Sequence, residues 1–416
     1  MEITFLLPIL VSSVGMYLLI RLRAFFIIHP IRTAAEVGRA LKDRRSRRSF
    51  LLALAGTLGV GNIFGVAAGI MIGGAGSLFW LFISSAFAMA IKYAETLLVF
   101  DVKNSRGGTA ALIAEAFEKI GPFLSPIYAI LTVILALFMG AAMQSSAVVD
   151  ILDGTLEISP ISSVVLLLLL LIPALLGGVS KIENITEIII PMTTIIYITV
   201  CFLVIFVNIN RLGTVINSMI ASAFSFRSAV GGGLSFLVVK EGFARGILSN
   251  EAGVGTSAMA HARSGQQDPR MGGLFAMCEV GFDSVILCSL TGLVILTSVD
   301  NPAEFSSPMS LVYAAFYGVL GNGAAYVLIP VILAFGYATI ICWYFYGLEY
   351  SASYFRRLKT VYPLLFILSL FLPIILGDGA MLSVIDVCLL FMSFMTLSVI
   401  IKRMNKILSL SKKDPG

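Results

Sequence analysis

Charged residues are scarce in this chain. Lys, Arg, Asp and Glu make up only 12% of its 416 residues, whereas a soluble globular protein carries about 25%. Hydrophobic residues reach 58%, and apolar stretches about 20 residues long, enough to cross a bilayer, recur along the chain. The roughly ten-residue alternating stretches of a transmembrane barrel are absent. The composition therefore excludes an ordinary soluble domain and predicts an all-α polytopic protein in a lipid bilayer.

Cysteine and histidine are too few and too dispersed to form a metal centre or a disulfide framework. The 5 cysteines lie inside apolar stretches, and the 2 histidines, His29 and His261, are far apart. We expect His261 to be a loop residue rather than a ligand. No nucleophile supports an enzyme, so we expect no catalytic residue and no cofactor. The net charge of +5 comes from basic loops and does not indicate a nucleic-acid partner.

The order of charges around the apolar stretches predicts the orientation of the chain. Glu2 precedes the first stretch and Arg21 and Arg23 follow it, which is the reverse of a secretory signal. We therefore keep this stretch as a membrane span. Basic loops stay in the cytoplasm, so the N-terminus is expected outside and the C-terminus inside. The expected location is the cytoplasmic (inner) membrane.

The apolar stretches predict about eleven transmembrane helices, namely one extra N-terminal helix and ten core spans. A less hydrophobic stretch between core spans five and six predicts a helix or loop on the outer surface. The expected regions are the extra N-terminal helix (1–28), a basic cytoplasmic loop (29–48), core spans one to five (49–208), the outer surface helix or loop (209–230), core spans six to ten (231–402) and a basic cytoplasmic tail (403–416).

The stretch Gly56–Asn62 interrupts the first core span. Each of its three glycines weakens a helix by about 1 kcal/mol relative to alanine. A break leaves backbone groups that hydrocarbon cannot satisfy, so it is tolerated where it faces a polar cavity. Close packing of helices through small residues is the alternative. We interpret Gly59, Val60, Gly61 and Asn62 as half of a binding site.

A second interruption lies in the sixth core span, from Arg245 to Ser257. This segment carries an arginine, an asparagine, a glutamate and three glycines at membrane depth, where a charged residue costs about 3 kcal/mol. Core spans one and six open two sets of five spans that run in opposite directions. Paired interruptions of this kind are typical of secondary transporters. Freed amides favour a carboxylate and freed carbonyls favour an ammonium group or Na⁺, so the pattern suits a small zwitterion.

Several of these segments resemble the alanine or glycine:cation symporter family (sodium:alanine symporters). They are Gly59–Ile63, Ser249–Gly255 with the following His261, Phe282–Ser284 and Thr339–Trp343. The resemblance implies a leucine-transporter-like fold with a five-plus-five inverted repeat, here with one extra N-terminal helix. It also implies cation-coupled uptake of alanine, glycine or a similar amino acid.

The resemblance also implies roles for individual residues. A wider similarity to neurotransmitter:sodium symporters assigns a cation to the carbonyls of Ala55 and Leu58 and the hydroxyl of Thr339. The substrate pocket would be formed by Gly59, Val60, Gly61, Asn62, Gln144, Leu248, Ser249, Asn250 and Trp343. This chain departs from the family at Val60, where the family has threonine, at Leu248, where it usually has an aromatic residue, and at Ala338, where it has serine.

Three of these residues keep a structural alternative. Asn62 binds a cation or a carboxylate, or it only satisfies the broken backbone. Gln144 contacts the substrate or makes an interhelical hydrogen bond worth about 1 kcal/mol. Trp343 forms an apolar wall of the pocket or anchors its helix at the membrane interface.

The remaining intramembrane charges are candidates for gating or proton transfer. Arg245, Glu251 and Asp283 are gate or proton-carrier candidates, although Arg245 and Glu251, six residues apart, meet only across a break in the helix. Lys92 and Glu95 lie three apart near the inner end of core span two, and we expect a gate or a snorkelling pair.

The sequence thus predicts a secondary active transporter that couples the uptake of a small neutral amino acid to a monovalent cation, with Na⁺ as the expected ion. One alternative is a proton-coupled or differently specific amino-acid or amine transporter on the same fold. Another is a membrane sensor that does not transport. The oligomeric state is left open.

Overall fold

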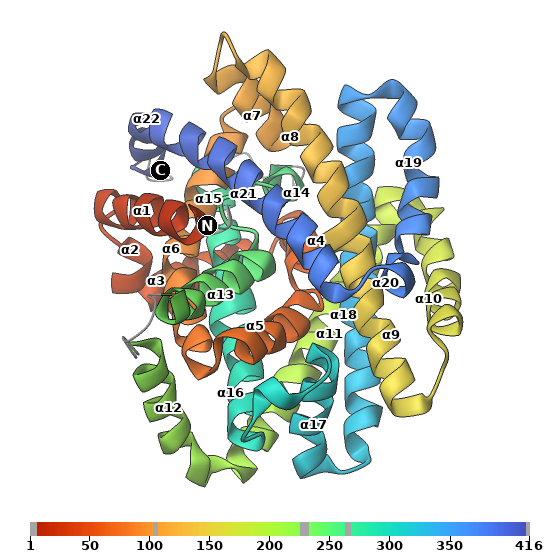
Figure 1. Cartoon of the computed structure of the whole chain (residues 1–416). Coiled ribbons are helices and arrows are strands. Elements are labelled where there is room, and N and C mark those ends of the chain that lie inside the picture. The colour runs from red at the N-terminus through yellow and green to blue at the C-terminus, as the bar shows by residue number, and fades with distance from the viewer. Residues whose placement is uncertain (1–5, 103–106, 225–232, 263–267, 413–416) are drawn as a thin grey trace.

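The computed structural model describes residues 6–102, 107–224, 233–262 and 268–412, and these residues form helices and no strands (Figure 1). The helices are α1 (Leu6–Arg21), α2 (Phe25–Ile28), α3 (Pro30–Ala40), α4 (Arg44–Thr57), η2 (Gly61–Gly65), α5 (Val66–Gly73), α6 (Ala75–Phe100), α7 (Gly108–Ala116), α8 (Gly121–Leu135), η4 (Ala136–Ala142), α9 (Met143–Leu156), α10 (Pro160–Leu175), α11 (Gly178–Val207), α12 (Ile209–Ala223), α13 (Gly233–Asn250), α14 (Ala258–Ala262), α15 (Pro269–Val280), η5 (Gly281–Cys288), α16 (Ser289–Ser298), η6 (Pro302–Glu304), α17 (Pro308–Leu320), α18 (Gly323–Tyr354), α19 (Arg356–Ser369), α20 (Leu372–Ile375), α21 (Asp378–Lys402) and α22 (Met404–Ser411).

Six helices of the described chain are long and apolar enough to cross a membrane, and a bent pair of helices makes a seventh span. Other apolar helices are shorter: α1 and α10 have 16 residues each, and α17 has 13. The structure therefore confirms a multi-pass helical protein, but it does not confirm about eleven spans. The number of about eleven spans stays a prediction; helix α19, for example, has 14 residues, and the 4-residue α20 follows it after a turn.

The first core span is interrupted where the glycines predict it. Helix α4 begins at Arg44, and the Asp43 side chain accepts a hydrogen bond from the Ser46 N–H (2.8 Å), which lowers the pKa of that carboxyl. The helix ends at Thr57, and the chain resumes as η2 and α5 at an angle of 45° to α4. The two halves of this span thus point in different directions from a break in the middle of the protein.

The second interruption is a longer irregular segment between α13 and α14. Helix α13 ends at Asn250, and α14 begins only at Ala258. Between them Glu251, Gly253 and Gly255 have φ values of 56°, 82° and 85°, in the left-handed region. A non-glycine residue rarely adopts that region, so the chain stops winding as a helix immediately after Asn250.

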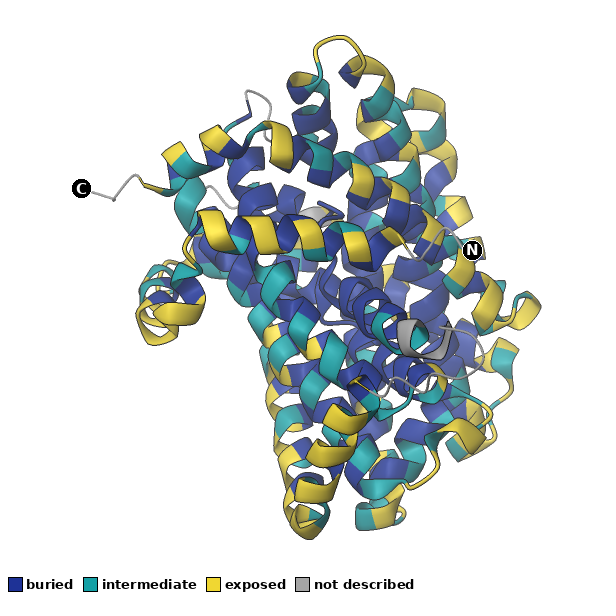
Figure 2. Ribbon diagram, turned by 60° about the vertical axis from the view of Figure 1, so that its left-hand side comes forward, coloured by how far each residue is buried: buried dark blue, intermediate teal, exposed yellow. Residues whose placement is uncertain are grey.

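The interrupted helices lie at the centre of the protein. In Figure 1, α4, α5 and α13 lie in the middle, with α12 and α17 at the lower edge and α7 at the upper edge. Buried residues concentrate in this centre, while exposed residues lie mainly on the outward faces of the surrounding helices (Figure 2). Three π-helical segments, η2, η4 and η5, belong to this core, and such segments are frequent at functional sites.

Three regions between the predicted spans contain helices. The region predicted as a basic loop contains helix α3, whose Glu36 forms an ion pair with Arg270. Helix α7 follows the polar residues after α6. Both helices are short, which is why hydropathy over a bilayer-length window missed them. Helix α12 lies in the region that the sequence predicts as an outer surface helix or loop, and residues 225–230 of that region lie outside the described residues.

Candidate functional site

A small cavity lies where the two interrupted helices meet. Its empty volume is about 200 Å³, and α4, η2, η4, α9, α13 and α18 contribute its walls. Every residue that lines it is buried, so the cavity is closed in this conformation. A larger surface hollow beside α12 holds an ion pair between Arg211 and Asp300, but no sequence-predicted site residue lines it. The small cavity is therefore the candidate site.

An oxygen pair lies at the end of α4 beside this cavity. The Thr339 hydroxyl of α18 donates a hydrogen bond of 2.9 Å to the carbonyl oxygen of Ala55. Gly59 lies against the same hydroxyl, because a Cβ atom at this position would lie 2.6 Å from Thr339 Oγ1. Leu58 occupies the break itself, and its N–H donates to Leu54. The structure thus brings together Ala55 and Thr339, two of the three predicted cation ligands.

Gln144 bridges two helices beside the cavity. Its side-chain oxygen accepts a hydrogen bond from the Val60 N–H (2.8 Å), and its amide donates to the Met139 carbonyl (3.1 Å). The Val60 amide is one of the groups that the helix break sets free, so Gln144 satisfies it. In this conformation Gln144 makes the interhelical contact that the sequence left open, at the edge of the candidate site.

Trp343 forms a wall of the cavity. Its side chain is completely buried, and its indole N–H donates to the Gly56 carbonyl at 3.3 Å. Gly140 makes this position possible, since a Cβ atom there would lie only 2.2 Å from Trp343 Cβ. A completely buried indole is not an interfacial anchor, so the structure rules out that alternative.

A polar network connects the two interrupted helices on another side of the cavity. The Ser249 hydroxyl of α13 lies 2.7 Å from Asn62 Oδ1 of η2 and 2.5 Å from Asp283 Oδ2 of η5. Asn250 follows Ser249 and donates a hydrogen bond of 2.9 Å to Ser284. Four sequence-predicted residues from three elements therefore converge: Asn62, Ser249, Asn250 and Asp283. Leu248 also lines the cavity, and Gly61 lies opposite its carbonyl.

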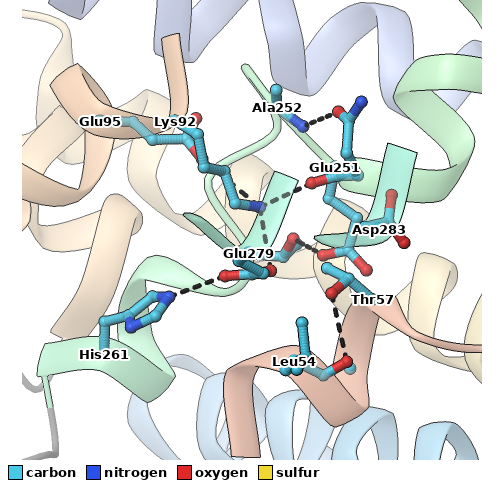
Figure 3. Close-up of polar contacts among 12 residues, drawn as sticks. Leu54, Thr57, Lys92, Glu95, Glu251, Ala252, His261, Glu279 and Asp283 are labelled. Atoms are coloured by element: carbon cyan, nitrogen blue, oxygen red, sulfur yellow. Dashed lines mark hydrogen bonds and ion pairs between the residues drawn. The ribbon is translucent and has the colours of Figure 1, made fainter. Parts of the chain in front are cut away.

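A buried charged cluster surrounds the break after α13, and Figure 3 shows its side chains pointing toward one another. The Lys92 ammonium of α6 donates to the carbonyl oxygen of Asn250 (2.8 Å), at the C-terminal end of α13. It lies 3.8 Å from Glu95 and 3.7 Å from Glu279. A cation is favourable at this helix end, because the free carbonyls give it partial negative charge.

The carboxylates of this cluster have further partners. Glu95 accepts from the Gly253 N–H at 2.9 Å, and Glu251 accepts from the Thr256 hydroxyl. Glu279 lies 2.7 Å from the ring of His261. Each of these side chains is at most 1% exposed. We call Lys92, Glu95, Glu251, His261 and Glu279 the inner cluster.

A second charged group lies earlier on α13. Arg245 lies 3.1 Å from Glu241 and 3.6 Å from Asp386 of α21, and its side chain is 4% exposed. Gly69 gives it room, since a Cβ atom there would lie 3.0 Å from the arginine stem. We call Arg245, Glu241 and Asp386 the outer cluster.

Three sequence-based expectations are corrected here. Lys92 and Glu95 are completely buried and do not snorkel, because their partners come from the broken helix rather than from water. His261 belongs to helix α14 and not to a loop, and it contacts Glu279. Arg245 and Glu251 do not meet, since each is bound to other residues on its own side of the break.

Sequence reasoning missed Glu279 and Glu241. Both are acidic residues at membrane depth, and that property alone marks them as candidates. Their partners could not be inferred, because Lys92 and Glu279 are joined only by the packing of α6 against α15. At the start of α15, Arg270 forms an ion pair with Glu36 of α3 in the same non-local way.

Comparison with solved structures finds proteins with a similar fold. A manganese transporter of Eremococcus coleocola aligns with a TM-score of 0.53 at 16% sequence identity, covering 85% of this chain and 76% of that one. This likeness concerns the fold alone.

Comparison of sequences identifies relatives of the chain and its family. The sodium/alanine symporter AgcS of Methanococcus maripaludis is 29% identical over 358 residues, covering 82% of this chain and 78% of that protein. The probable sodium/glutamine symporter GlnT of Bacillus subtilis is 29% identical over 370 residues, covering 86% and 76% respectively. The model of the sodium:alanine symporter family matches residues 1–413. Because this match spans nearly the whole chain, the protein belongs to the sodium:alanine symporter family and is a membrane transporter rather than an enzyme.

Proposed function

We propose that this chain is a sodium-coupled symporter of a small neutral amino acid such as alanine or glycine. The observation that carries the proposal is the buried cavity between the two interrupted helices, with the Ala55–Thr339 oxygen pair at its edge. Both ligands would bind here without a cofactor. The relatives described above carry sodium and an amino acid in their names, which supports the same pairing.

The walls of the cavity suit a zwitterion with a short side chain. The segment that starts at Gly61 directs a helix N-terminus toward the cavity, which favours a carboxylate. The free carbonyls at the end of α13 favour an ammonium group. Trp343, Leu248, Met139 and Met143 contribute apolar surface.

The proposed cation site uses the end of α4. Na⁺ prefers hard oxygen ligands, and the Ala55 carbonyl and the Thr339 hydroxyl supply two of them. The Leu58 carbonyl is the third proposed ligand. Binding of Na⁺ here would fix α18 against the break in α4 and so stabilise the pocket wall that includes Gly59.

The inner and outer clusters are proposed as the two gates. The outer cluster joins α13 to α21, and the inner cluster joins the break after α13 to α6 and α15. Alternating access would require these contacts to form and separate in turn. We further propose the five-plus-five inverted repeat with an extra N-terminal helix, about eleven spans, and an inner-membrane orientation with the N-terminus outside and the C-terminus inside.

Uptake into proteoliposomes tests the proposed function. We expect labelled alanine to accumulate when an inward Na⁺ gradient is imposed, and to fall to the level of empty liposomes when choline replaces Na⁺. Accumulation that persists in choline but follows a proton gradient would make the chain a proton-coupled transporter. Binding without accumulation under either gradient would indicate a sensor, and both outcomes would refute sodium symport.

Substitution of Thr339 tests the proposed cation site. Thr339→Val removes the hydroxyl and keeps the shape of the side chain, so we expect the Na⁺ concentration for half-maximal uptake to rise at least about tenfold, equivalent to about 1.4 kcal/mol. Thr339→Ser keeps the hydroxyl and should remain within about threefold of wild type. An unchanged Na⁺ dependence in Thr339→Val would place the ion elsewhere. The measurement is alanine uptake at increasing NaCl with choline keeping the ionic strength constant.

A further inference from the structure

The Ser249 hydroxyl has more acceptors than it has hydrogens. Its oxygen lies 2.7 Å from Asn62 Oδ1, 2.5 Å from Asp283 Oδ2 and 3.1 Å from Cys288 Sγ. A hydroxyl carries one hydrogen, and an amide oxygen and an ionised carboxylate are acceptors only. Two oxygen–oxygen contacts of hydrogen-bond length therefore share one hydrogen, and one contact lacks its own.

The other neighbours of Asp283 do not supply the missing hydrogen. The Ser284 hydroxyl donates to Asp283 Oδ2 at 2.7 Å, and the Asn250 amide donates to the Ser284 oxygen. The second carboxyl oxygen, Asp283 Oδ1, has no hydrogen-bond partner among the described residues. A completely buried carboxylate with one unpaired oxygen is costly when it is ionised.

Turning the Asn62 amide over would let it donate to Ser249, but this orientation is unfavourable while Asp283 is ionised. The Asn62 side chain also interacts with the Asp283 carboxyl group. With its amide reversed, the nitrogen would donate to Ser249, but the carbonyl oxygen would face the carboxyl instead. That orientation is unfavourable while Asp283 is ionised, because the amide oxygen and the carboxylate would both present negative charge to each other.

The charges that face Asp283 add to the same requirement. Lys92 is the one lysine among the charged groups near Asp283, so the acidic groups outnumber the basic ones even when His261 is protonated. Completely buried charges of this kind destabilise a protein unless they are compensated. The titratable groups around Asp283 are Lys92 of α6, which has Glu95 beside it, Glu251 after α13, Glu279 of α15, with His261 bound to it, and Cys288 at the end of η5.

We propose that Asp283 is a proton-binding site of this transporter and is protonated in the closed conformation. Its O–H group donates to Ser249, and Ser249 in turn donates to Asn62, so that each contact has its own hydrogen. When the cavity opens to water, the Asp283 O–H bond breaks and the proton passes to water. This site is separate from the Ala55–Thr339 oxygen pair. The inference deepens the proposed function and rests on it for its role in transport.

Infrared spectroscopy of the full chain in lipid nanodiscs tests the protonation directly. A protonated carboxylic acid has a carbonyl band that an ionised carboxylate lacks, and this band shifts in D₂O. At neutral pH we expect the band in wild type and its loss in Asp283→Asn, whose amide can donate to Ser249 in the same way. The matched control is Asp386→Asn, which removes another intramembrane acid and should leave the band in place.

Labelling keeps the test decisive if Asp283→Asn does not fold. Wild-type protein with carboxyl-¹³C aspartate should show a shifted band, and the same labelled protein carrying Asp386→Asn should show it too. A band that is absent at neutral pH, that belongs to a glutamate, or that disappears in Asp386→Asn would overturn the proposal. The spectra require neither alanine nor Na⁺, so failure of the symport assay would leave this test unaffected.

Discussion

Replacement of Gly140 by alanine is expected to reduce alanine uptake by at least about tenfold. The new methyl group would lie 2.2 Å from Trp343 Cβ and 2.5 Å from its Cγ, both close to the backbone of α18. Those atoms cannot move without displacing the helix, and overpacking of this kind costs about 1–3 kcal/mol. The displacement would move Trp343 away from the cavity and break its bond to Gly56. Sodium-driven uptake, normalised to the amount of protein in the membrane, measures the effect.

Gly281→Ala is the matched control for this substitution. Gly281 also belongs to a π-helical segment near the site, but its new methyl group would have Met89 Cε at 3.9 Å as its nearest neighbour. That distance is ordinary van der Waals contact, so uptake should stay within about twofold of wild type. Wild-type uptake by Gly140→Ala would show that the close approach of η4 to α18 does not shape the site.

Replacement of Lys92 by methionine is expected to destabilise the protein by about 3–5 kcal/mol, the usual effect of leaving a buried charge without its partner. Lys92 is completely buried and is the only lysine of the inner cluster, where it holds the Asn250 carbonyl and lies near Glu95 and Glu279. Its loss leaves the carboxylates uncompensated and frees the end of α13. The melting temperature of purified protein in detergent measures the change.

A second substitution separates the loss of charge balance from the loss of side-chain packing. Lys92→Met combined with Glu279→Gln removes one charge of each sign and should recover part of the lost stability. Lys181→Met removes an exposed lysine of α11 and should change stability by less than about 0.5 kcal/mol. If the double variant were no more stable than Lys92→Met alone, the ion pair would not account for the buried lysine.

The interruptions of the two helices could be predicted because their causes are local. Gly59 and Gly61 weaken α4 at a definite place, and Gly253 and Gly255 supply the left-handed φ values that end α13. Polar residues at membrane depth mark the same positions. The candidate residues around the cavity follow from these breaks, and the structure brings Asn62, Ser249 and Asp283 into direct contact.

The partners of the charged residues could not be predicted, because they depend on how distant helices pack. Lys92 reaches Asn250, which is 158 positions away in the chain, and no local spacing encodes that contact. The spacing of three residues between Lys92 and Glu95 predicted an exposed pair near the end of a helix. His261 seemed to lie in a loop because the following residues are polar, but α14 carries it into the interior.

The most direct test of the central claim is equilibrium binding of labelled alanine to the purified chain in NaCl and in choline chloride. If the buried cavity holds the amino acid and the adjoining oxygen pair holds the cation, alanine should bind one molecule per chain in NaCl. Its dissociation constant should rise at least about tenfold in choline chloride, equivalent to about 1.4 kcal/mol of coupling. Equal affinity for alanine in the two salts would contradict the account.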